Sequence, residues 1–183
     1  MIISSFLYIL FIFLELVFFI LFAVYMVFLV ISHLKGSPYV PSNSKVLDEI
    51  LKAAKLKRNT VFYDLGCGDG RVVKKAVEKY SVKGYGFDIN PLLLFISRLF
   101  AKLSGLKNIY FINQNINQVG LKKADVVYVF LMPNFLDKLK PKFLKDLRRG
   151  TLVISHGFKI EGWNGRLFKK LDNKPFPTYF YRI

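Results

Sequence analysis

The most informative stretch of the chain is D-L-G-C-G-D-G-R at residues 64–71, which directly follows the β-branched and aromatic run V-F-Y. This order predicts a strand, a tight loop and the start of a helix. Gly66, Gly68 and Gly70 allow positive φ angles and leave no Cβ in the way of a ligand. The dinucleotide fingerprint needs its third glycine where Arg71 stands, so the spacing disfavours NAD. A plain strand–turn–helix would leave the glycines and acids unexplained, and we expect a ligand without a phosphate here.

A second acid lies at the end of the next predicted strand. That strand is expected over residues 82–87, and Asp88 follows it, 20 residues past Gly68. An acid in this position is suited to accept hydrogen bonds from the hydroxyl pair of a ribose. The same run, D-I-N-P at 88–91, also suits a turn that caps a helix over residues 91–103. The two roles are compatible.

The elements that must position these residues alternate between strand and helix. The pattern predicts a strand that begins at residue 61, strands over residues 82–87, 109–113, 126–131 and 151–155, helices over 72–80 and 91–103, and a helix capped by Asn43 or Ser44 whose apolar stripe runs from 46 to 54. The apolar run V-V-Y-V-F-L at 126–131 is typical of a strand buried on both faces. Residues 166–171 and 178–183 alternate like a hairpin. We therefore expect an open, mostly parallel Rossmann-like α/β sheet with helices on both faces and an antiparallel C-terminal hairpin.

Residues 133–150 combine helical apolar spacing with a basic character. Lys138, Lys142, Lys145 and Arg149 occupy faces other than the apolar one. Pro141 is expected to divide this segment or to start its second piece. A solvated basic face and a membrane contact are both open interpretations.

The N-terminal segment is a predicted transmembrane anchor. Residues 6–31 contain one charge, Glu15, and as a helix they would cross the ~30 Å hydrocarbon core. A secretory signal is disfavoured because the run is too long and has neither a preceding basic residue nor a small-x-small cleavage site. Glu15 is either protonated or paired within the membrane, or it marks a membrane partner. The predicted organisation is an anchor over 4–32, a linker over 33–43 and a domain over 44–183.

The charges around the anchor predict its orientation. Lys35, Lys45 and Lys52 follow the span and no basic residue precedes it, so the domain is expected in the cytoplasm, on a single-pass cell-membrane protein. All 28 lysines and arginines follow the anchor with 11 of the 12 acids, a net charge of +17. That field suits nucleic acid, anionic lipid headgroups or an acidic protein, and the anchor favours headgroups.

Together, these motifs resemble the class I, or seven-β-strand, S-adenosylmethionine-dependent methyltransferases. More narrowly, the chain is similar to the membrane-anchored protein-lysine N-methyltransferases related to those that modify the ATP synthase c subunit and the adenine nucleotide translocase. The matching features are one N-terminal span, P-Y-V-P-S at 38–42, D-L-G-C-G-D-G-R at 64–71, D-I-N-P at 88–91 and a closing strand at 179–183.

The resemblance implies S-adenosylmethionine as cofactor and a set of residues that bind it. These are Asp64, Gly66, Gly68, Asp69, Gly70, Asp88, Asn90 and Asn115. The loop would hold the methionine portion and Asp88 the ribose, although many relatives have Glu at that position. Asn115 stands where such enzymes often have an acid facing adenine, and its carbonyl oxygen would accept from the adenine amino group.

The resemblance leaves the catalytic residues open. Transfer from a sulfonium depends mainly on positioning, but a lysine acceptor must first lose a proton. His156 and Asp69 are the candidate bases, whereas Cys67 is expected to be a packing residue. No metal site is predicted. Tyr39, Pro41 and Ser42 suit either a stiff connector or a lid over the site, and Pro133 and Asn134 lie where substrate would bind.

The predicted function is a protein-lysine N-methyltransferase that acts on a membrane or membrane-associated protein. M-P-N-F at 132–135 departs from the Asn/Asp-Pro-Pro-aromatic motif of enzymes that methylate nucleic-acid amino groups, so a nucleic-acid partner is disfavoured. The alternatives are a methyltransferase of RNA, one of a membrane-dissolved quinone or lipid, and a non-catalytic cofactor-binding scaffold.

Overall fold

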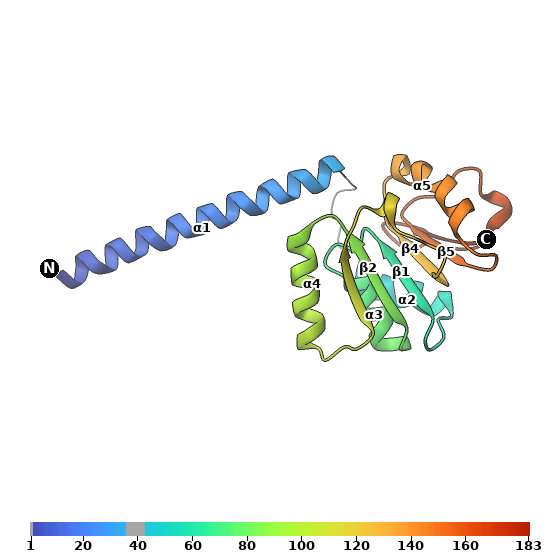
Figure 1. Ribbon diagram of the computed structural model, residues 1–183, viewed down its shortest axis with the longest axis horizontal. Helices are drawn as coiled ribbons and strands as arrows, with labels where there is room; N and C mark the ends of the chain where they lie inside the picture. Colours follow the sequence, from blue (N-terminus) through green and yellow to red (C-terminus); the bar gives the residue numbers. More distant parts are fainter. Residues whose placement is uncertain (1, 36–42) are drawn as a thin grey trace.

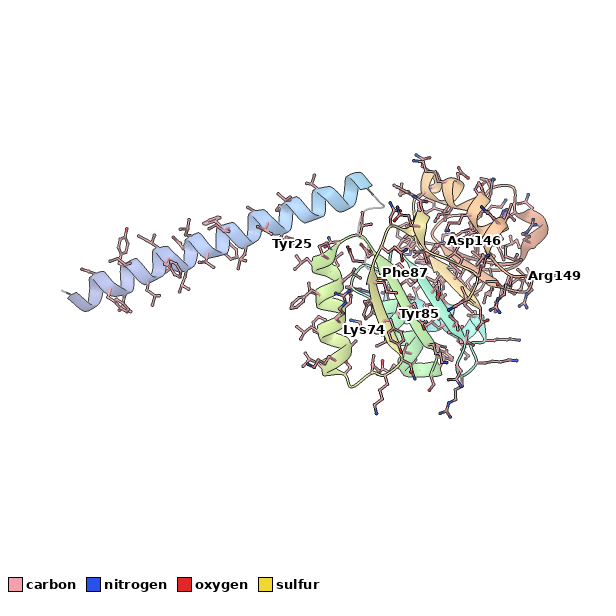
Figure 2. All side chains as sticks on the ribbon, in the orientation of Figure 1. Tyr25, Lys74, Tyr85, Phe87, Asp146 and Arg149 are labelled. Atoms are coloured by element: carbon pink, nitrogen blue, oxygen red, sulfur yellow. The ribbon has the colours of Figure 1, made fainter. Side chains whose placement is uncertain are left out.

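The computed structural model describes residues 2–35 and 43–183, without the side chains of 2–4, 28–29 and 31–35 (Figure 1). The first element is the long helix α1, Ile2–Lys35, of 34 residues. Its part from Ser5 to Val27 is long and apolar enough to cross a membrane, judged by length and composition. The side chains along this part, Tyr25 among them, stand out from the helix and are exposed (Figure 2). The helix extends past both ends of the predicted anchor.

The domain that follows, over residues 43–183, contains a seven-stranded sheet with the strand order β3-β2-β1-β4-β5-β7-β6. Its first five strands pair in parallel, whereas β7 pairs antiparallel with both β5 and β6. The elements are α2 (Ser44–Ala54), β1 (Val61–Leu65), α3 (Arg71–Tyr80), β2 (Lys83–Asp88), α4 (Pro91–Leu103), β3 (Ile109–Asn113), η1 (Ile116–Gln118), β4 (Val126–Val129), α5 (Pro133–Asp146), β5 (Leu152–His156), η2 (Asn164–Arg166), β6 (Leu167–Leu171) and β7 (Thr178–Arg182). The predicted fold class, including the closing hairpin, is confirmed.

Two apolar cores lie on opposite faces of the sheet. Because strand side chains alternate, Phe62 faces the core that contains α2, α3 and α4, whereas Tyr63 and Leu65 face the core that contains α5. β4 is buried at every position, as a strand between two helix layers should be. The parallel strands therefore bring their carboxyl ends to one edge, where the candidate residues lie.

Asparagine caps set the starts of two helices. The Asn43 side chain accepts a hydrogen bond from the backbone N–H of Lys45 at the start of α2, and Asn90 accepts from Leu92 and Leu93 at the start of α4. Such caps satisfy N–H groups that lack a partner within the helix. The cap at Asn90 confirms the turn predicted for residues 88–91.

Two sequence expectations need correction. Helix α5 runs unbroken from Pro133 to Asp146 with Pro141 inside it, rather than dividing there. Leu139 and Phe143 on either side of the proline are fully buried, and their packing outweighs the hydrogen bond that a proline removes. The strand predicted over residues 126–131 ends at Val129, which is the last residue of β4 to pair with β1 (through Leu65) and with β5 (through Ser155).

Candidate active site

The glycine loop leaves β1 and enters α3 through three left-handed residues. The φ angles of Gly66, Gly68 and Gly70 are +84°, +54° and +71°. Residues with a Cβ rarely adopt these angles, so the backbone itself requires glycine. A Cβ on Gly70 would also lie 2.3 Å from Cε1 of Phe111, and one on Gly66 would lie 3.1 Å from Cδ2 of Leu131. The glycine loop is thus closely packed against the side chains of Phe111 and Leu131.

Strand β2 and helix α4 hold this loop in place. The carbonyl oxygen of Phe87 accepts from the N–H groups of Gly66 (2.8 Å) and Cys67 (3.0 Å). The buried Ser97 hydroxyl, on α4, lies 3.2 Å from the carbonyl oxygen of Gly68 and 2.8 Å from that of Leu93, so its one proton is shared between these two acceptors. Because these bonds come from neighbouring elements of the fold, the loop is preorganised for a ligand.

Asp88 links the loop to the end of β2. Its Oδ2 accepts from the backbone N–H of Gly68 at 2.9 Å, and its Oδ1 accepts from that of Asn90 at 2.8 Å. A carboxylate oxygen can accept more than one hydrogen bond, so both oxygens retain capacity for the hydroxyls of a ribose. The carboxylate is therefore fixed in orientation beside the loop that it is predicted to serve.

Asp64 is the most unusual group at this edge. Its side chain is buried, and Oδ2 has no hydrogen-bond partner among the described residues. Burial raises the pKa of Asp64 well above its usual range, and the nearby carboxylates of Asp88 and Asp69 raise it further. Three acids thus converge in a strongly basic chain. An orphaned acceptor among acids fits a cationic ligand, and S-adenosylmethionine carries both an ammonium and a sulfonium.

Asp69 is held by its neighbour two residues on. The Arg71 Nε lies 3.0 Å from both carboxylate oxygens, its Nη2 lies 2.8 Å from Oδ2, and its backbone N–H donates to Oδ1. Partial burial acts to raise the pKa of Asp69, but these hydrogen bonds outweigh it and the pKa is lowered. An ionised carboxylate clamped in this way is a weak base, and its predicted catalytic role stays a prediction.

Some of the residues predicted to face adenine and substrate lie at the carboxyl edge of the sheet, and the others lie outside the described residues. Asn115 is exposed after β3, and its Oδ1 already accepts from the N–H of Asn117. Pro133 and Asn134 are exposed on the first turn of α5, beyond the end of β4. Since Val129 of β4 pairs with Leu65 of β1, this turn lies next to the glycine loop. The predicted lid residues Tyr39, Pro41 and Ser42 lie outside the described residues.

His156 is enclosed at the end of β5. The residue is 3% exposed, its ring centroid lies 4.5 Å from that of Phe130, and its Nδ1 lies 2.9 Å from the Thr178 hydroxyl. Burial lowers the pKa of His156 to about 4, so the imidazole is neutral and weakly basic. β4 lies between this residue and the glycine loop in the sheet. Its role as a base stays a prediction, but its surroundings are those of a structural histidine.

Replacing His156 with Phe is expected to change the pH dependence of stability. The folded pKa of about 4 lies below the unfolded value of 6.5, so the histidine's contribution is complete above pH 6.5 and is lost as the pH falls towards 4. Between about pH 7.5 and about pH 5 that loss amounts to about 2 kcal/mol. Denaturant titrations at the two pH values should show a smaller loss in the variant. An equal loss in both proteins would contradict a neutral buried histidine.

Some residues that build the site carried no motif. The one signal for Ser97 is that it is a polar residue on the otherwise apolar buried face of a helix, P-L-L-L-F-I-S-R-L-F-A-K-L at 91–103. Phe111 of β3 and Leu131, which follows β4, are distant from the loop in the sequence and could not be assigned to it. Cys67 is buried against Gly86, where an added Cβ would lie 2.7 Å from its Sγ, which agrees with a packing role. Within the described residues, no three His, Cys, Asp or Glu side chains group as metal ligands.

Comparison with known proteins places this geometry in context. Residues 64–166 match the ANTKMT methyltransferase domain. A protein-lysine N-methyltransferase of Saccharolobus islandicus is 35% identical over 156 residues, which cover 83% of this chain and 97% of that protein. The adenine nucleotide translocase lysine N-methyltransferase of Mus musculus is 30% identical over 127 residues, or 69% of this chain. This chain spans only 55% of the length of the mouse protein.

A solved structure shares both fold and sequence with this chain. It is an RNA methyltransferase from Salinibacter ruber in complex with S-adenosyl-L-homocysteine. The TM-score is 0.75 at 32% identity, over 79% of this chain and 94% of the other. S-adenosylhomocysteine is what S-adenosylmethionine becomes when its methyl group has been transferred.

Proposed function

We propose that this chain, which belongs to the ANTKMT methyltransferase domain family and is an S-adenosylmethionine-dependent methyltransferase, methylates lysine side chains of a membrane-associated protein. The observation that carries the choice of lysine is the similarity to the Saccharolobus islandicus protein-lysine N-methyltransferase, nearly all of which is covered at 35% identity. The mouse relative is named for a lysine of the adenine nucleotide translocase, and this favours a protein substrate.

The cofactor supplies a methyl group on a positively charged sulfur, which needs no covalent activation by the protein. The chain's own residues bind and orient. With the cofactor bound, Gly66, Gly68 and Gly70 would admit its methionine portion to the backbone, the buried Asp64 carboxyl would offer its unpartnered oxygen to the positive charge, and Asp88 would accept from the ribose. Such positioning can supply most of the acceleration that a transfer of this kind needs.

A lysine acceptor brings an electrostatic conflict with this chain. An unperturbed lysine has a pKa of about 10.4, and nearby cations or burial lower it and favour loss of the proton. The net charge of +17 after α1 thus assists deprotonation but opposes the docking of a basic target. Holding enzyme and substrate in one membrane raises their effective concentration and offsets this repulsion.

Helix α1 is the proposed anchor. In the expected orientation the domain lies on the cytoplasmic side of the cell membrane, where cationic segments are attracted to anionic headgroups. The predicted linker over 33–43 is short, and only residues 36–43 separate the end of α1 from the start of α2, so the active site stays near the bilayer. Membrane proteins, or proteins bound to them, are then the acceptors within reach.

RNA is the second candidate acceptor. The Salinibacter ruber enzyme is described as an RNA methyltransferase, and the positive charge of this chain would suit a phosphate backbone. The sequence M-P-N-F at residues 132–135, next to the glycine loop, favours the lysine proposal because it departs from the motif of nucleic-acid amino-methylating enzymes.

The distribution of transferred label tests the acceptor class. The full-length protein is incubated with methyl-labelled S-adenosylmethionine and native membranes, and the product is divided by protease, ribonuclease and organic extraction. We expect label that protease releases and that neither ribonuclease nor solvent removes. Label lost to ribonuclease would support RNA as the acceptor, and label extracted into solvent would support a quinone or lipid. Either result would refute the lysine proposal.

A further inference from the structure

Helix α4 exposes an apolar face to solvent. Its inner face is buried through Leu94, Ser97 and Ala101, as expected for a helix that packs on a sheet. On the opposite side, Phe95 is 62% exposed, Leu99 44% and Leu103 73%. These three residues are spaced four apart and therefore follow one another along a single face. We call Phe95, Leu99 and Leu103 the outer face of α4.

This exposure is concentrated in one region of the domain. Outside α1, the large apolar side chains that are exposed in the described chain are Phe95, Leu99, Phe100, Leu103, Tyr110, Ile112, Met132, Leu144 and Phe168. Four of the nine belong to α4, at the edge of the sheet, whereas Tyr110 and Ile112 of the neighbouring β3 point to the opposite face of the sheet, where Tyr110 stacks on Tyr85. Figure 1 shows α4 at the margin of the domain, with no other element of the domain over its outer side. A clustered apolar surface of this kind marks an interaction site.

All charged side chains of α4 are positive. The helix has no acid, and Arg98 and Lys102 lie beside the apolar residues; the Arg98 guanidinium also donates to the carbonyl oxygen of Phe111, with its Nη2 at 2.7 Å. Across the helix, the Lys74 ammonium of α3 lies 5.0 Å from the ring centroid of Phe100. Apolar residues bordered by cations are the pattern of a helix that lies in the interface of an anionic membrane. A second copy of the chain would bring Arg98 and Lys102 against cations across a twofold axis, so it fits this surface less well.

We propose that the outer face of α4 docks on the surface of an anionic bilayer, with its apolar side chains among the headgroups and its cations beside lipid phosphates. This inference rests on the proposed anchoring by α1. Helix α1 ends at Lys35 and α2 begins at Ser44, so the residues between them can span at most about 30 Å. A tether of this length creates a high local concentration of bilayer at the domain, and weak interfacial contacts are then sufficient.

Docking through α4 would orient the active site. The helix begins at Pro91, three residues after Asp88, and runs back alongside the sheet. With α4 lying flat on the bilayer, the strands run parallel to the membrane plane and their carboxyl edge opens along its surface. The glycine loop would thus face chain segments that lie at headgroup level, rather than targets deep in the cytoplasm.

Spin labels at two matched leucines test this contact. Leu99→Cys places a label on the outer face of α4, and Leu144→Cys places one on α5, across the sheet; the native side chains are 44% and 47% exposed. The native Cys67 is buried and burial raises the pKa of its thiol, so labelling favours the introduced cysteines. The full chain is inserted into vesicles of phosphatidylcholine and phosphatidylglycerol and purified by flotation. The rate at which each spin label collides with a water-soluble nickel complex is then measured.

We expect the label at 99 to collide with nickel roughly threefold less often than the label at 144 in floated vesicles. Lys102→Glu should narrow that difference, whereas Lys145→Glu on α5 should leave it unchanged. Equal collision rates in floated vesicles would overturn the α4 contact while leaving the anchor intact. Strong spin–spin broadening at 99 would overturn it in favour of a second copy. Failure of the chain to float would refute the anchor, and the α4 contact would fall with it.

Discussion

Replacing Asp88 with Ala is expected to lower the affinity for S-adenosylhomocysteine by about 100-fold or more. The change removes the acceptor of the Gly68 N–H at 2.9 Å and of the Asn90 N–H at 2.8 Å, and with it the predicted ribose contact. Each unsatisfied buried group costs about 1–3 kcal/mol, and hydrogen bonds to a charged group are among the stronger ones. Isothermal titration calorimetry of the full chain in detergent measures the loss.

Two further variants separate the contact from general damage. Asp88→Asn keeps the size of the side chain but sets an amide N–H₂ against one of the two backbone donors, so it should lose most of the affinity as well. Asp137→Ala removes an exposed carboxylate on α5 and should leave the affinity unchanged. If Asp88→Ala bound the ligand as tightly as the native chain, the ribose assignment would be wrong.

Replacing Gly70 with Ala is expected to lower the free energy of unfolding by about 3 kcal/mol. The φ angle of +71° is unfavourable for alanine by about 1 kcal/mol, and the new Cβ would lie 2.3 Å from the Phe111 ring, an overpacking that costs about 1–3 kcal/mol. For a chain of this size the melting temperature should fall by about 9 °C. Trp163, the single tryptophan, is buried in the domain and reports its unfolding by fluorescence.

Gly105→Ala provides the control for Gly70→Ala. Gly105 has a similar φ of +63°, but nothing lies within 4 Å of the position that its Cβ would take. This variant should therefore show the backbone strain alone, a fall of about 3 °C. Cofactor affinity should fall only in Gly70→Ala, because only that residue belongs to the loop. Equal effects of the two substitutions would contradict the close packing of the loop on Phe111.

Local patterns were sufficient to predict the order of strands and helices. Buried parallel strands have continuous apolar runs, as in residues 126–129, and caps such as Asn90 precede their helices. The glycine loop was predictable because positive φ angles at alternate positions demand a distinctive sequence. Pro141 was misjudged because tertiary packing of Leu139 and Phe143 overrides a local preference.

The support of the site was not predictable from local patterns. The contact of Gly70 with Phe111 and the bond from Ser97 to Gly68 join residues that are far apart in the sequence. The enclosure of His156 by Phe130 depends on how two strands sit side by side. Helix α4 is apolar on two faces, so its periodicity alone could not indicate which face packs on the sheet and which stays exposed. Only the assembled fold separates the two.

The most direct test of the proposed function is the identity of the amino acid that receives the methyl group. Native membranes are labelled by the full-length protein, with Asp88→Ala as the inactive control, and the protein fraction is hydrolysed and separated by chromatography. We predict that the label co-elutes with Nε-methylated lysine and that it is absent from the Asp88→Ala sample. Label in another amino acid, or in RNA or lipid with none in protein, would contradict the assignment as a protein-lysine methyltransferase.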